Sequence, residues 1–138
     1  MDKSDYKLLA VLQQNARTSI QELADHIGAS TASVQRRLKV LRDGGVIQKE
    51  VAVLDPKKLG FSITAVVSVE LERDRLDQID AFKRKARQDQ QVMNFYCIAG
   101  DGDFMMIVVA KDIEDYETFT HRFFFADKTV RKFRTSIV

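Results

Sequence analysis

A chain of 138 residues can form one ordinary domain or two small ones, and its 45% hydrophobic and 30% charged residues are typical of a globular protein. No apolar run approaches the roughly 20 residues that cross a bilayer, and the polar, acidic N-terminus is unlike a secretory signal, so we expect a cytoplasmic protein with no membrane contact. The net charge of +2 is spread unevenly, with ten Lys/Arg against seven Asp/Glu in residues 1–60, which permits nucleic-acid binding by the first half without requiring it.

Apolar residues at helical spacing predict three helices in the first half of the chain. The second helix opens at Ser19, which forms an S-x-x-E capping box with Glu22, and Gly28 ends it. Ser30 is a suitable N-cap for the third helix, and a Gly-Gly pair follows the end of that helix. The residues expected to face inward are Leu8, Leu9, Leu12 and Ala16 in the first helix, Ile20, Leu23, Ala24 and Ile27 in the second, and Val34, Leu38 and Leu41 in the third.

The link between the second and third helices runs only from Gly28 to Ser30. So short a link forces the two helices to cross sharply, which is the geometry of a helix-turn-helix motif. Ala24 and Gly28 are small where the helices would approach each other, and Val34 would fill the angle between them.

Residues 46–53 alternate loosely between apolar and polar side chains, which predicts a two-stranded wing after the third helix. We therefore expect residues 1–54 to form a winged helix-turn-helix DNA-binding domain. The stretch around the single proline, Pro56, is typical of a linker, and we place that linker at residues 55–61.

Residues 62–138 are predicted to form a second domain with the element order strand, helix, strand, strand, helix, strand. Asp101 and Gly102 supply the Asp-Gly pair of a hairpin turn between the two middle strands. This βαββαβ order is that of a ferredoxin-like domain, so we expect the chain to be of the α+β class. The strands are expected at residues 63–71, 92–99, 104–110 and 130–138, and the helical stripes are Leu76, Ile79, Phe82 and Ala86, then Ile113, Tyr116, Phe119 and Phe123.

Both faces of the predicted sheet carry apolar side chains. Residues 104–110 are apolar on both alternating faces, and Val66 points away from the face that carries Val67 and Val69. Two helices can cover only one face of a four-stranded sheet, so the other face must contact something else. We expect a second copy of the chain there, and hence a homodimer; a monomer with an exposed apolar face is the alternative.

The outward side of the third helix is polar and basic, which is typical of a recognition helix. Hydroxyl groups near its N-terminus suit phosphate or base-edge contacts, Arg36 suits guanine, and Gln35 suits adenine. Lys39, Arg42 and the wing residue Lys49 suit phosphates. A merely solvated basic face is the alternative interpretation. The predicted DNA-binding residues are Ser30, Thr31, Ser33, Gln35, Arg36, Arg37, Lys39 and Lys49.

The sequence contains no recognisable catalytic group, metal site or cofactor motif. His26 and His121 lie far apart, and the single Cys97 sits in an apolar run, so we expect it to be a buried, inert thiol. Gly100-x-Gly102 lacks the third glycine of a dinucleotide-binding motif. We therefore expect neither an enzyme nor a bound cofactor or metal.

An ordered series of short motifs extends along essentially the whole chain. Its residues are Asp5-x-x-Leu8-Leu9-x-x-Leu12-Gln13-x-Asn15-Ala16-Arg17, Glu22-Leu23-Ala24, Gly28-x-Ser30, Val34-x-x-Arg37-Leu38-x-x-Leu41, Gly45-Val46-Ile47, Leu54-Asp55-Pro56-x-x-Leu59-Gly60 and Gly100-Asp101-x-Asp103-Phe104. Together they resemble the leucine-responsive regulatory protein family of transcription regulators, also called the Lrp/AsnC or feast/famine family.

The resemblance implies a homodimer that often assembles further, commonly to an octamer, and that senses amino acids between its C-terminal domains. It implies an effector site that includes Gly100, Asp101 and Asp103, in which Asp101 would hold an α-ammonium group. A plain Asp-Gly hairpin turn is the alternative. Two features depart from the family: Ala99 stands where relatives often have a hydroxyl residue, and the chain ends at Val138, where many relatives continue.

We therefore expect a sequence-specific transcription regulator that binds double-stranded DNA and responds to an amino acid or a related small metabolite. A weakly specific architectural DNA-binding protein is one alternative. Another is a metabolite-binding module that acts on a protein partner, although the basic face of the third helix disfavours it. A small enzyme has no supporting residues.

Overall fold

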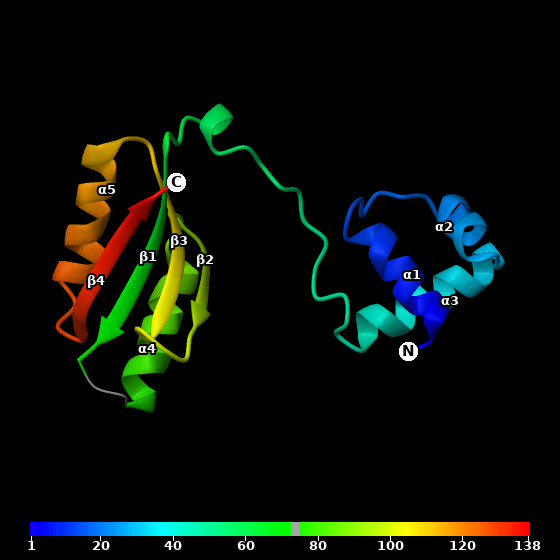
Figure 1. Ribbon diagram of the computed structural model, residues 1–138, viewed down its shortest axis with the longest axis horizontal. Coiled ribbons are helices and arrows are strands. Elements are labelled where there is room, and N and C mark those ends of the chain that lie inside the picture. Colours follow the sequence, from blue (N-terminus) through cyan, green and yellow to red (C-terminus); the bar gives the residue numbers. More distant parts are fainter. Residues whose placement is uncertain (73–74) are drawn as a thin grey trace. The chain divides into compact units, whose positions relative to one another are not determined.

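The computed structural model describes residues 1–72 and 75–138, and these form two compact units, Met1–Val53 and Leu54–Val138 (Figure 1). Each unit has its own hydrophobic core. No helix within the described ranges is long and apolar enough to span a membrane.

The first unit consists of three helices, α1 (Lys3–Leu12), α2 (Ile20–Ile27) and α3 (Thr31–Asp43). Ser19 and Glu22 form the predicted capping box at the start of α2. The predicted inward-facing residues of these helices make up the core of the unit, with two exceptions at its margin. The exceptions are Ala16, which is exposed because α1 ends before it, and Leu9, which is half-buried. The fully buried residues of this unit are Leu8, Leu23, Ala24, Val34, Leu38 and Leu41.

The sharp α2–α3 crossing rests on two local features that the sequence predicted. Gly28 closes α2 with a φ of 65°, in the left-handed region that favours glycine, and Ser30 then caps α3 by accepting the N–H of Ser33 at 3.2 Å. Val34 is fully buried in the angle between the helices. The helix-turn-helix geometry is therefore confirmed.

The two-stranded wing expected at residues 46–53 is not formed, since this segment contains no strand. Only Ile47 of the segment packs against the core, whereas Val51 and Val53 are exposed. A hairpin of two very short strands is marginally stable by itself, and a single packed side chain, Ile47, holds this segment to the domain.

The second unit has the predicted βαββαβ order. Its sheet is antiparallel with the strand order β2-β3-β1-β4, which confirms the α+β, ferredoxin-like prediction. A short 3-10 helix, Lys57–Leu59, precedes the first strand, and α5 continues into one π-helical turn, His121–Phe125. The remaining elements are β1 (Ile63–Leu71), α4 (Leu76–Gln88), β2 (Val92–Cys97), β3 (Phe104–Ala110), α5 (Ile113–Thr120) and β4 (Val130–Ile137).

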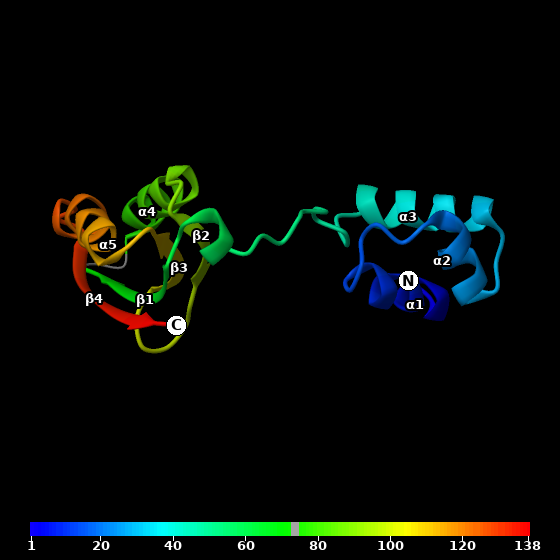
Figure 2. The same ribbon diagram turned by 90° about the horizontal axis from the view of Figure 1, so that it is seen from above.

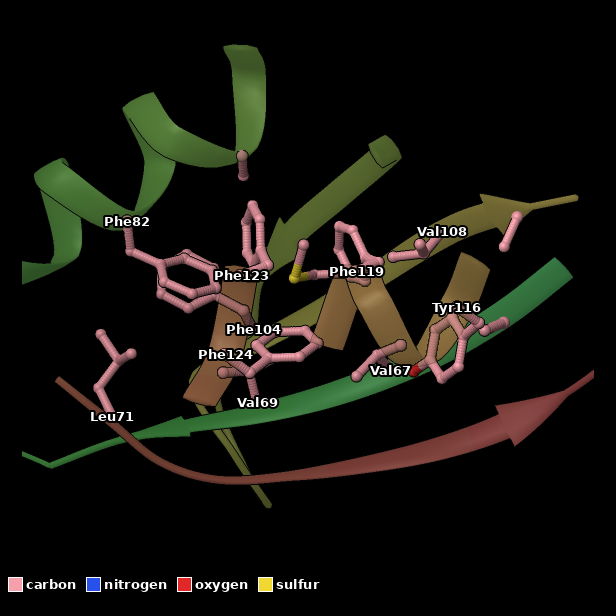
Figure 3. Close-up of a cluster of buried hydrophobic side chains, with 14 residues drawn as sticks. Val67, Val69, Leu71, Phe82, Phe104, Val108, Tyr116, Phe119, Phe123 and Phe124 are labelled. Atoms are coloured by element: carbon pink, nitrogen blue, oxygen red, sulfur yellow. The ribbon is translucent and has the colours of Figure 1, made fainter. Parts of the chain in front are cut away.

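Both helices of this unit cover the same face of the sheet (Figure 2). Between them and the strands lies a cluster of aromatic and branched side chains, in which Phe82 stacks on Phe104 and Phe119 stacks on Phe123 (Figure 3). Leu76 and Ile113, expected to face inward, are instead 79% and 55% exposed. Each is the first residue of its helix, and the stripe that packs on the sheet starts further along.

The opposite face of the sheet is not covered by either helix. The strand register places Val66 of β1 beside Ile107 of β3, and Met105 of β3 beside Tyr96 of β2, so these four side chains form an apolar area. The register places Lys132 of β4 beside Glu70 and Arg134 beside Ser68, on this same face of the sheet. The β4 part of the face is therefore basic. Tyr96 is 56% exposed, and the other three are half-buried. We call this surface the open face.

Candidate DNA-binding surface and effector-binding turn

The exposed side of α3 carries most of the residues predicted to contact DNA. Thr31, Gln35, Arg36 and Lys39 are exposed, and Ser33 is half-buried. Within the first unit, α3 runs along one side, and α1 and α2 lie on the other side, below it in the view of Figure 2. The Ser30 hydroxyl oxygen accepts the Ser33 N–H, but its own O–H remains able to donate to a phosphate.

Arg37 is the exception within the predicted set. Its Nη1 lies 2.8 Å from Asp2 Oδ2 and 2.8 Å from Asp5 Oδ1, so the guanidinium is held against the N-terminus of α1. The Arg37 guanidinium and the Asp5 N–H hold the pKa of Asp2 below its usual range. The pKa of Asp5 is lowered by the Asp2 N–H and by Arg37. Arg37 therefore does not join Arg36 on the exposed side.

Two further cations of α3 have acidic partners that were not predicted from the sequence. Lys39 pairs with Asp43 one helical turn later, and this contact raises the pKa of Lys39. Arg42 Nη2 lies 3.1 Å from Glu50 Oε1. The i,i+4 spacing of Lys39 and Asp43 was a signal available in the sequence, whereas the Arg42–Glu50 pair depends on the path of the chain after α3.

The turn between β2 and β3 is built on two glycines with positive φ, 138° at Gly100 and 104° at Gly102. The Ser68 hydroxyl donates to the Asp101 carbonyl at 3.5 Å, while the Asp101 side chain is exposed. The turn therefore lies against the C-terminal half of β1 and presents the Asp101 carboxylate to solvent.

Asp103 fastens this turn to β1. Its Oδ2 accepts the Leu71 N–H at 2.6 Å, and its own N–H donates to the Val69 carbonyl at 2.8 Å. The register between β1 and β4 shifts at Glu70 and Leu71, so the Leu71 N–H is bound by a side chain at an irregular point of the sheet. Of the three predicted effector residues, Asp103 thus has a structural partner and Asp101 is available to a ligand.

Charged residues at and just after the end of β1, and one at the start of β4, surround the turn. With the turn they line a depression of about 380 Å³, and four of its lining residues are acidic and one is an arginine. Glu70, Glu72 and Arg131 were not predicted from the sequence, because only the strand register brings them to the turn. The lining residues are Glu70, Leu71, Glu72, Gly100, Asp101, Gly102, Asp103 and Arg131.

One prediction about the chemistry of the chain is wrong. Cys97 is exposed, not buried, because β2 is an edge strand of the sheet and Cys97 is its last residue. His26 and His121 are also exposed. Within residues 1–72 and 75–138 no three His, Cys, Asp or Glu side chains are grouped as metal ligands.

Two known families account for almost the whole chain. Residues 64–138 match the family described as the Lrp/AsnC ligand binding domain, and residues 1–48 match the winged helix-turn-helix DNA-binding family. A helix-turn-helix transcriptional regulator of Sinorhizobium fredii is 45% identical over 138 residues, which are all of this chain and 82% of that protein. The DNA-binding transcriptional activator DecR of Escherichia coli is 35% identical over 122 residues, 88% of this chain and 80% of DecR.

Solved structures agree with these matches. A transcriptional regulator of Neisseria meningitidis, solved as a complex with L-methionine, aligns with a TM-score of 0.90 and 27% identity over all of this chain and 89% of that one. An AsnC family regulator of Agrobacterium tumefaciens aligns with a TM-score of 0.88 and 30% identity over all of this chain and 90% of that one. The helix-turn-helix geometry, the ferredoxin-like domain and these relatives lead to one conclusion: the chain belongs to the Lrp/AsnC family of DNA-binding transcription regulators, with a second domain that binds a small-molecule effector.

Proposed function

We propose that α3 is the recognition helix of this regulator and that its exposed side enters the major groove of double-stranded DNA. The observation that carries the proposal is the state of Arg36, which is exposed and has no ion-pair partner in the described part of the chain. An arginine whose guanidinium is not engaged in an ion pair with the protein can donate two hydrogen bonds to guanine, at O6 and N7. Gln35, beside it, has the donor and acceptor that match adenine.

The remaining predicted contacts fit the phosphate backbone. Ser30, Thr31 and Ser33 surround the N-terminus of α3, where free backbone N–H groups favour an anion. Lys39 and Lys49 are exposed cations that would pair with phosphates on either side of the groove. Such contacts give affinity and orientation, whereas Arg36 and Gln35 give sequence preference.

We propose that the turn at residues 100–103 forms part of the effector site and that an amino acid is the effector. The depression at the turn offers carboxylates for an α-ammonium group and the Arg131 guanidinium for an α-carboxylate. Asp101 is the carboxylate best placed for the ammonium group, because it is exposed, whereas Asp103 already binds Leu71. The relative from Neisseria meningitidis that was solved with L-methionine supports an amino acid as the class of effector.

We infer that two chains form a homodimer through the open face. Its four apolar side chains, Val66, Tyr96, Met105 and Ile107, lie next to one another on the uncovered side of the sheet, and burying them against a second copy is favourable. The family resemblance implies further assembly, up to an octamer. As a regulator that acts on DNA, the protein would work in the cytoplasm and catalyse no reaction.

Selection of bound DNA tests this function. The full chain would be incubated with genomic fragments, with and without pooled standard amino acids, and the retained fragments would be sequenced. We expect a shared sequence motif whose recovery changes when one amino acid is present. Retention without any preferred motif would indicate an architectural protein, and no retention at all would favour a module that acts on a protein partner.

A further inference from the structure

The start of α1 and the middle of α3 are joined by one hydrogen-bonded network. Asp2 Oδ1 accepts the N–H groups of Ser4 and Asp5 at 2.9 and 3.1 Å, and Asp5 Oδ2 accepts the Asp2 N–H at 2.8 Å. These bonds form the cap of α1. The second oxygen of each carboxylate contacts Arg37, so the same two side chains cap one helix and bind the other.

This network lies beside the exposed side of α3. Met1, Asp5 of α1, and Ser33 and Arg36 of α3 are among the residues that line a surface depression next to Arg37. The Asp5 side chain is only 13% exposed, and the Nε of Arg37 is buried without a hydrogen-bond partner. The Arg37 guanidinium is therefore held from two sides, one residue away from Arg36.

The packing of the first unit shows what the network adds. Each of α1 and α3 approaches α2 closely, while α1 and α3 approach each other less. The core thus holds α2 against both α1 and α3, and the Asp2–Asp5–Arg37 network adds an ionic tie directly between α1 and α3 in the described residues.

We propose that Arg37 is a positioning residue for DNA recognition, which sets the orientation of α3 on the DNA through Asp2 and Asp5 and does not itself contact the phosphates. This inference rests on the proposed function, because it assumes that α3 is the recognition helix. It assigns a role to Asp2 and Asp5, two acidic residues close to a surface that binds a polyanion.

The sign of the electrostatic effect makes the proposal testable. Two carboxylates and one guanidinium carry a net charge of −1, which repels DNA. If the network had no positioning role, removing one carboxylate would strengthen DNA binding, because less negative charge would lie near the phosphates. If the network positions α3, removing a carboxylate weakens binding to the preferred sequence in spite of that gain.

The experiment compares Asp5→Asn with Asp43→Asn in the full chain. Both changes remove one negative charge from a partner of an α3 cation, but Asp43 belongs to an exposed i,i+4 pair that stabilises little. Asparagine retains a side-chain oxygen that can accept the Asp2 N–H. Affinity would be measured by fluorescence anisotropy for two probes, a duplex selected by the wild-type chain and a scrambled duplex, across a range of salt concentrations.

We expect Asp5→Asn to weaken binding to the selected duplex by about tenfold and to leave binding to the scrambled duplex equal or stronger. Asp43→Asn should strengthen binding to both. Arg37→Ala should also lose sequence preference, with a salt dependence equal to that of the wild type, because no phosphate contact is lost. Arg37→Lys should restore part of the preference by pairing with one carboxylate.

Equal or tighter binding of the selected duplex by Asp5→Asn would overturn the proposal. So would a decrease of about 0.9 in the salt slope of Arg37→Ala, which is the loss of one phosphate contact. Thermal unfolding reports whether Asp5→Asn folds, and if it does not, the exposed Asp2→Asn decides by the same criteria. A wild-type chain that selects no duplex would refute the proposed function itself, whereas normal selection with an unaffected Asp5→Asn refutes only the role of Arg37.

Discussion

Gly102 lies so close to Ser68 that a Cβ atom at this glycine would stand 2.9 Å from the Ser68 hydroxyl oxygen and 3.3 Å from the Val69 carbonyl oxygen. Its φ of 104° is also one that side-chain-bearing residues rarely adopt. Two independent constraints, space and backbone conformation, therefore require glycine at this position.

Replacing this glycine should disturb the turn and the proposed effector site together. We expect Gly102→Ala to destabilise the second unit by about 1–3 kcal/mol, because both the clash and the strain must be relieved. Gly100→Ala is the control, since its φ is also positive but no atom lies within 4 Å of its Cβ position. Urea unfolding measures both variants, and equal losses would show that the contact with Ser68 is unimportant.

Arg36→Ala should reduce DNA affinity without changing stability. Loss of one bidentate contact to guanine costs about 1–3 kcal/mol and flattens discrimination at one base pair. Arg84→Ala removes the same charge from an exposed position of α4 in the second unit and should leave the binding profile intact. A profile for Arg36→Ala that matches the wild type at every base pair would remove this residue from the proposed contacts.

The two aspartates of the turn should respond differently to substitution. Asp101→Ala should abolish the effect of the amino acid on DNA affinity while leaving stability unchanged, because the Asp101 side chain is exposed. Asp103→Ala should cost about 1–3 kcal/mol of stability, because the Leu71 N–H loses its acceptor.

Calorimetric titration with the standard amino acids and urea unfolding separate the two effects. Asp103→Asn, which keeps an acceptor oxygen, should recover most of the stability that Asp103→Ala loses. Ligand binding by Asp101→Ala that equals that of the parent chain would show that the turn has only a structural role.

A charge placed on the open face should prevent dimerisation. Ile107 lies at the centre of its apolar area, between Val66 and Asn94 in the strand register, so Ile107→Glu would bring a carboxylate into the proposed interface. In sedimentation velocity we expect this variant to be a monomer and the wild type to be a dimer. Ile113→Glu introduces the same charge at an exposed position of α5 and should remain dimeric. A dimeric Ile107→Glu would place the interface elsewhere.

Stability should fall in acid as the Lys85–Asp127 pair is lost. Burial by itself raises the pKa of Asp127, but Lys85 and the Thr129 hydroxyl outweigh it, so the pKa in the folded chain lies below the ordinary 3.8. The folded state thus binds this proton less readily than the unfolded state does. The stabilisation that the pair gives is fully present above pH 3.8 and is lost as the pH falls through the lower pKa of the folded chain.

Chemical unfolding of the wild type and Asp127→Asn checks this sign. The difference in unfolding free energy between the two should be present at neutral pH and should shrink below pH 3.8. Asp80→Asn, at an exposed position of α4, is the matched charge control. A difference that grows in acid would mean that the pair does not stabilise the folded chain.

Local signals account for the parts of the fold that could be predicted. The capping residue Ser19 and the helix-ending Gly28 act on their immediate neighbours, so their roles are visible in a few letters of sequence. The alternation along β1 likewise reveals which side of the strand is buried.

The features that could not be predicted depend on distant residues. Arg37 contacts partners 32 and 35 residues away, and Asp103 binds a backbone N–H 32 residues away, and no spacing rule reveals either contact. Cys97 is exposed because β2 lies at the edge of the sheet. The hydrophobic pattern of that strand does not reveal its position in the sheet. The predicted DNA contacts and the three effector residues remain predictions that the experiments above address.

The exposed thiol of Cys97 gives a means of following assembly in solution. It is the single cysteine of the chain, so a maleimide dye would attach once per subunit, on the sheet-forming domain, without any substitution. Chains labelled with a donor dye and chains labelled with an acceptor dye could then be mixed, and energy transfer between them would report how fast subunits exchange. Adding each amino acid to that mixture would show directly whether an effector tightens or loosens the association of subunits.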